Sequence, residues 1–142
     1  NPGEKISREI EKITGISDAM LSDMPTVDKV LPAFHDFLRG AMGVAHNAEF
    51  DVGMLHYESA RLGIKCDYTV LCTLKMARSL VQIERRNLDA LAKHFDLTFE
   101  SRHRSIGDIL VTAGVLWKML EENPHLKLIS DLYSFREYFP QD

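Results

Sequence analysis

The sequence has 142 residues, of which 45% are hydrophobic and 27% are charged, and its formal net charge is −4. This hydrophobic content excludes an intrinsically disordered chain, and the most apolar stretch, residues 109–120, is shorter than the roughly 20 residues of a transmembrane helix. Two cysteines are too few for a disulfide framework and indicate a reducing compartment. We therefore expect a globular cytoplasmic domain that does not cross a membrane.

The first half of the chain alternates between helical and extended patterns. Apolar spacing predicts a short helix ending at Gly15 and a second helix over residues 26–40 with one buried stripe. Residues 41–45 are a short apolar run typical of a buried strand. Asn47 is placed to cap the next helix, which ends near Gly63 and has one apolar face formed by Phe50, Met54 and Tyr57.

The second half begins with another strand candidate, residues 68–73, which is rich in β-branched and aromatic residues. Apolar residues at helical spacing then predict three helices, at residues 74–80, 88–95 and 106–120. Asn87 is the predicted cap of the second of these helices and Ser105 of the third. We divide the chain into a main domain, residues 1–123, and a C-terminal tail, residues 124–142. The tail is expected to be a helix, an irregular packing arm or a linker.

Alternation of strands and helices predicts an α/β fold, but the pattern supplies only two strands. Roughly three or more are needed for a stable sheet. The chain also opens at Asn1 without an initiator methionine. We therefore expect the remaining strands to lie before Asn1.

The first polar constellation is the segment His46-Asn47-Ala48-Glu49-Phe50-Asp51, where a strand is followed by a helix. Ligands of open α/β sheets bind at the carboxyl ends of strands, which makes this a candidate site. A purely structural interpretation stays open: Asn47 is a cap and Asp51 interacts with the helix dipole.

The second constellation is His103-Arg104-Ser105-Ile106-Gly107-Asp108, at the start of the long helix. Ser105 and Asp108 have the spacing of a capping box, which is the structural alternative. A loop histidine beside a carboxylate also suits a general base next to a metal ligand. Two carboxylates alone are too few to hold two Mg²⁺ ions beside a phosphodiester, so this chemistry requires a further acidic pair.

Both constellations resemble motifs of the DEDDh superfamily of 3′-to-5′ exonucleases, in particular the epsilon-subunit and PolC-type proofreading group. The resemblance extends from residue 1 to about residue 122, and the matching segments occur in the same order as in the family. These segments are Asn1-Pro2-Gly3, residues 13–16, Met20, Pro25, and residues 34–37, 44–48, 72–74 and 112–113. It departs from the family at Ser105, at Gly107-Asp108-Ile109 and at Cys72, where the family often has aspartate. The resemblance implies a ribonuclease-H-like mixed sheet flanked by helices.

The resemblance also implies residue roles. Asp51 and Asp108 would bind two divalent cations, Mg²⁺ or Mn²⁺, and His103 would be the general base. His46, Asn47 and Phe50 would shape the pocket for the terminal nucleotide. The family's first motif, Asp-x-Glu, would precede residue 1, so the chain as written is expected to be inactive alone.

The implied activity is removal of nucleotides from a single-stranded DNA 3′ end, with a DNA polymerase or a fused domain as possible partner. Two alternatives stay open: a catalytically incomplete module that binds nucleic acid or a polymerase, and an exonuclease directed at RNA or short oligonucleotides. A zinc site is disfavoured because the two cysteines and the histidines lack paired metal-ligand spacing.

Overall fold

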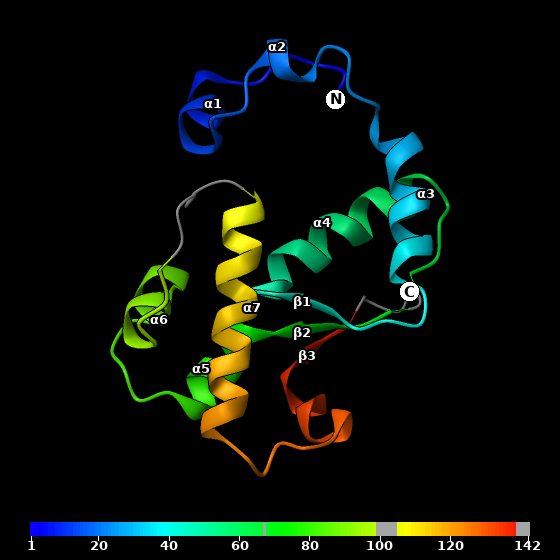
Figure 1. Ribbon diagram of the computed structural model, residues 1–142. Coiled ribbons are helices and arrows are strands. Elements are labelled where there is room, and N and C mark those ends of the chain that lie inside the picture. The colour runs from blue at the N-terminus through cyan, green and yellow to red at the C-terminus, as the bar shows by residue number, and fades with distance from the viewer. Residues whose placement is uncertain (67, 99–104, 139–142) are drawn as a thin grey trace.

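The computed structural model describes residues 1–66, 68–98 and 105–138. Within them the chain forms α1 (Arg8–Thr14), α2 (Asp18–Leu21), α3 (Val27–Leu38), β1 (Gly43–Ala45), α4 (Ala48–Arg61), β2 (Val70–Cys72), α5 (Thr73–Leu80), α6 (Leu88–His94), α7 (Ser105–Glu122), the 3₁₀ helix η1 (Ile129–Phe135) and β3 (Arg136–Glu137). Each helix that the apolar spacing predicted is present, together with the short α2. The chain is thus α/β, as predicted (Figure 1).

The sheet has the order β1-β2-β3. β1 and β2 are parallel, with Val44 opposite Leu71, whereas β3 is antiparallel to β2, with Arg136 opposite Leu71. The tail thus supplies a third strand that the pattern did not predict, and the expectation of further strands before Asn1 stays a prediction. Lys75 fixes this strand, since its Nζ lies 2.6 Å from a carboxylate oxygen of Glu137 and donates a hydrogen bond to the Arg136 carbonyl.

The expectation of a helical or irregular tail was therefore incomplete, because residues 129–135 form a 3₁₀ helix and the two residues after it form a strand. Two polar residues carry no apolar alternation, so the pattern gave no signal for β3. The division of the chain at residue 123 stays a prediction.

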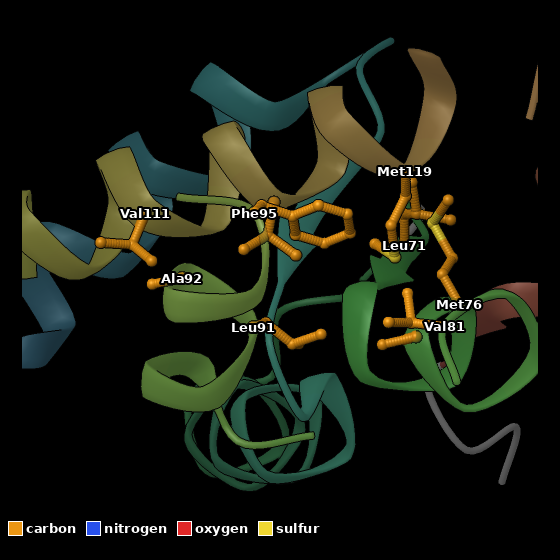
Figure 2. Packing of buried hydrophobic residues seen from close by; sticks show 10 residues of the cluster. Leu71, Met76, Val81, Leu91, Ala92, Phe95, Val111 and Met119 are labelled. Carbon is orange, nitrogen blue, oxygen red and sulfur yellow. The ribbon is translucent and has the colours of Figure 1, made fainter. Parts of the chain in front are cut away.

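Two hydrophobic clusters pack on opposite faces of β2, because successive side chains of a strand point to opposite sides. Leu71 belongs to the larger cluster, which includes side chains of α5, α6 and α7 (Figure 2). Val70 and Cys72 belong to the smaller cluster with Ala48 and Val52 of α4. β2 is therefore buried on both faces, and it holds the start of α4 and the body of α7 beside the same sheet.

The N-terminal segment differs from the rest of the chain because none of residues 1–25 is buried. Figure 1 shows α1 and α2 arching away from the sheet. α1 is nevertheless delimited as predicted: Gly15 ends it in the left-handed conformation, with φ 70°, which glycine adopts without steric cost. No helix in the described ranges has the length and apolar character needed to cross a bilayer.

The predicted apolar stripe of α3 is only partly buried. Leu31 is buried together with His35, which the stripe did not include. Val30, Phe34 and Phe37 are exposed. The expectation of a fully buried stripe was wrong for these three residues, because no described element covers that side of α3.

Candidate functional site

The junction between β1 and α4 contains the first constellation. β1 ends at Ala45, and α4 begins at Ala48, which is fully buried and fixes the helix start against the sheet. Asn47 has φ 65° and ψ 47°, the left-handed conformation that asparagine tolerates better than most residues. Asn47 is the N-cap residue of α4, as predicted, but its side chain makes no capping hydrogen bond. The tight turn places Asp51 in the first turn of α4.

His46 links this junction to the next element of the chain. Its Nδ1 shares a hydrogen bond of 3.0 Å with the Thr73 hydroxyl, which also donates to the Ala45 carbonyl. Partial burial lowers the pKa of His46, and Arg78 lowers it further, whereas a hydrogen bond with the main chain of Arg86 opposes the shift. His46 and Thr73 therefore link the end of β1 to the start of α5.

The second constellation is described only from Ser105 onward. Asp108 lies in the first turn of α7, and Thr112, one turn later, donates its hydroxyl proton to the Asp108 carbonyl at 2.8 Å. Asp108 is half-buried. The predicted general base, His103, lies outside the described residues, and so does the proposed Ser105 side-chain cap.

A groove of about 980 Å³ brings the two constellations together, because both Asp51 and Asp108 line it. One carboxylate comes from the first turn of α4 and the other from the first turn of α7. His46 and Phe50 line the same groove. Asn47 lines a shallower hollow of about 420 Å³ instead, and Phe50 borders both. Four of the five described candidate residues thus face one groove.

The electrostatic character of the groove is acidic. Partial burial raises the pKa of the Asp51 carboxyl group. Asp89, from the first turn of α6, lines the groove as a third acid. The sequence did not indicate that Asp89 lies in the groove, because α6 carries no other candidate residue. Among the described residues that line the groove there is no lysine or arginine.

Mg²⁺ and Mn²⁺ prefer carboxylate oxygens as ligands, so the side chains of Asp51 and Asp108 are chemically suited to bind a hard divalent cation. Within residues 1–66, 68–98 and 105–138, no group of three or more His, Cys, Asp or Glu side chains is placed to hold a metal ion together. The described residues alone therefore do not complete a metal site at Asp51 and Asp108. Beside it, the exposed ring of Phe50 offers an apolar face for a base.

The sequence and the fold of this chain are similar to those of known proteins. A family model described as "Exonuclease" matches residues 1–116. The chain is 39% identical over 137 residues to the PolC-type DNA polymerase III of Caldanaerobacter subterraneus subsp. tengcongensis, an alignment that covers 94% of this chain and 10% of that protein. It is 35% identical to the DNA polymerase III epsilon subunit of Aquifex aeolicus, covering 95% of this chain and 68% of the subunit.

The fold has a solved counterpart in a structure described as exonuclease X in complex with 5′ overhanging duplex DNA. The TM-score is 0.72 at 26% identity, and the match covers 95% of this chain and 76% of that one. The expected ribonuclease-H-like arrangement, a small mixed sheet flanked by helices, is thereby confirmed. The chain spans only a small part of the PolC-type relatives and about two thirds of the epsilon subunit.

Proposed function

This chain belongs to the exonuclease family whose model matches residues 1–116, and from that premise we propose that it removes nucleotides from DNA 3′ ends in a metal-dependent hydrolysis. The observation that carries the proposal is the convergence of Asp51 and Asp108 on one groove. Members of this family depend in general on divalent metal ions. The relatives named above are DNA polymerase III proteins, which supports DNA as substrate and a polymerase or a fused domain as partner.

We assign each candidate residue a role, and for the described residues the position supports it. Asp51 and Asp108 hold the divalent ions, and bound Mg²⁺ or Mn²⁺ would neutralise phosphate charge and lower the pKa of a water molecule. Phe50, which is 68% exposed, stacks against the terminal base, while Asn47 and His46 shape the turn beneath it. His103 is the general base that accepts a proton from the attacking water.

Nuclease assays on the natural polypeptide that contains this chain test the proposal. With 5′-labelled single-stranded DNA and Mg²⁺, we expect products shortened stepwise from the 3′ end. His103→Ala should reduce the rate by about 100-fold or more, the usual contribution of a general base, and Asp108→Asn by at least as much. Asp36→Asn, at an exposed carboxylate paired with Arg39 on α3, is the matched control and should retain full activity. Unchanged activity in both site variants would refute the proposal.

A second candidate, a binding module of the same fold without catalysis, is favoured by one observation. The described residues offer no third acidic side chain placed to share a metal with Asp51 and Asp108. Such a module would bind single-stranded DNA with the same affinity in Mg²⁺ and in a chelator, and would leave the DNA uncut. Competition between DNA and RNA ends in the same assay distinguishes a DNA exonuclease from an RNA-directed one.

A further inference from the structure

A histidine, a serine and a cysteine from three parts of the chain meet outside the groove. His35 lies in α3, Ser59 lies near the end of α4, and Cys66 lies in the segment that leads to β2. The Nε2 atom of His35 is 2.8 Å from the Ser59 hydroxyl oxygen and 4.0 Å from the Cys66 sulfur. The three side chains therefore form one contact between α3 and α4, whose neighbouring positions can be followed in Figure 1.

The environment of His35 differs from that of a histidine with only a structural role. His35 is 8% exposed, and its Nδ1 atom is buried without a hydrogen-bond partner among the described residues. Buried polar atoms of native proteins are nearly always paired, and an unpaired one calls for an explanation such as a catalytic or redox role. An apolar side chain would fill the same space without this cost. The hydrogen-bonding contacts that His35 does make are those of Nε2, with Ser59 and Cys66.

Cys66 has the surroundings of a reactive thiol, whereas the other cysteine, Cys72, does not. Cys72 is buried in the smaller cluster, and Cys66 is only half-buried at the edge of that cluster. The thiolate is the reactive form of cysteine, and a neighbouring imidazole promotes it by accepting the thiol proton. The ring of Tyr68 lies 5.3 Å from the imidazole of His35, and the face of an aromatic ring attracts the positive charge that this proton brings.

We propose that Cys66 is a modification site for hydroperoxides, at which His35 is the base. The imidazole accepts the thiol proton, and the thiolate attacks one peroxide oxygen, so that a sulfur–oxygen bond forms as the oxygen–oxygen bond breaks. The sulfur is oxidised by two electrons to a sulfenic acid. The peroxide is reduced, and its other oxygen takes the proton from His35 and leaves as water or an alcohol. The reaction adds an oxygen atom at the contact between α3 and α4, and it requires neither DNA nor a metal ion.

Trapping of the sulfenic acid in the natural polypeptide that contains this chain tests the proposal. The polypeptide is treated with hydrogen peroxide and dimedone, which labels sulfenic acids, and the label on each cysteine is quantified by peptide mass spectrometry. Ser130→Cys introduces a reference thiol at an exposed position of η1. Although Cys66 is less exposed, its labelling should be at least about 10-fold faster than that of the reference thiol. Equal or slower labelling of Cys66 would overturn the proposal.

Replacement of the base gives a second measurement. His35→Gln keeps a side chain that can hydrogen-bond with Ser59 but cannot accept the thiol proton, so it should slow the labelling of Cys66 by about 10-fold or more. Labelling of the reference thiol should not change. Ser59→Ala alters the same contact but keeps the imidazole, and as the matched control it should leave the rate at Cys66 nearly unchanged. A rate that His35→Gln does not lower, or that both variants lower equally, would also contradict the proposal. If His35→Gln does not fold, the reference thiol decides the outcome.

Discussion

Two regions of the molecule have similar apolar sequence patterns. The side chains between α5, α6 and α7 are buried, whereas those along the groove beside β1 are exposed. α7 contributes to both. Val111, Val115 and Met119, at spacings of four, are fully buried, whereas Ile109, on a neighbouring stripe, faces the groove. An apolar stripe shows that a helix face requires cover. It does not show which part of a polypeptide supplies that cover.

The largest effect that tests this comparison is expected at Leu91, a fully buried residue of α6 in the larger cluster. Leu91→Ala should lower the free energy of unfolding by about 2–5 kcal/mol, because it removes buried methyl groups and leaves a cavity. Ile109→Ala, on the groove side of α7, should change it by about 0.5 kcal/mol or less in the isolated chain. Urea denaturation monitored by Trp117 fluorescence measures both. Comparable losses would show that the groove is covered in solution.

The next effect concerns how β3 is held on the covered side of the sheet. Lys75→Met removes both the ion pair with Glu137 and the hydrogen bond to the Arg136 carbonyl. Because the Glu137 side chain is mostly buried, we expect a loss of about 1 kcal/mol, together with faster hydrogen exchange in β3. Lys118→Met, which breaks an exposed pair with Glu121, is the control and should have a negligible effect. A negligible effect of Lys75→Met as well would mean that pairing with β2 and the packing of η1 hold β3 in place without Lys75.

A smaller effect, of opposite sign, is expected at the turn that enters the groove. Asn47→Gly should raise the free energy of unfolding by about 0.5 kcal/mol, because glycine adopts φ 65° without strain and no cap is lost. Asn87→Ala should lower it by about 1 kcal/mol, because the Asn87 side chain accepts a hydrogen bond from the Ala90 amide. Thermal unfolding of the two variants compares the positions. A loss of stability in Asn47→Gly would indicate a side-chain interaction at Asn47.

The helices could be predicted from the sequence because local apolar periodicity indicates them, whereas the buried residues of α7, Val111, Val115 and Met119, were not identified. β2 was predicted from its run of β-branched and apolar residues, and the Asn87 cap was confirmed. β3 could not be predicted, since it pairs with β2, a strand more than sixty positions earlier in the chain. The exposure of Phe34 and Phe37 also escaped prediction, because burial depends on what lies beside a stripe.

The candidate site was predictable to a similar degree. Asp51 and Asp108 were identified from two motifs, and the structure places both in one groove. Their roles, and that of His103, stay predictions. Asp89 was missed because its position depends on the packing of α6 against α7, which no local pattern reveals. Asn47 was assigned a capping side chain, although its backbone conformation is the feature that matters at this turn.

The smallest expected effect is a pH dependence at His46, which connects the groove side of β1 to α5. Because burial lowers the pKa of His46 in the folded protein below its ordinary value of 6.5, the unfolded chain takes up the proton first as the pH falls. Proton uptake by His46 in the unfolded chain therefore destabilises the fold progressively below pH 6.5 and has no effect on stability above it. His46→Asn should therefore lose less stability than the parent protein between about pH 7.5 and about pH 5.

Urea denaturation at a series of pH values measures this difference, and His125→Asn, at an exposed residue after α7, is the control for loss of a surface histidine. The parent protein and His125→Asn should show the same slope of stability against pH. A parallel slope for His46→Asn would mean that the imidazole takes up its proton in the folded state as readily as in the unfolded chain. In that event the hydrogen bond with the main chain of Arg86, which favours the protonated imidazole, would offset the effect of burial on the pKa of His46.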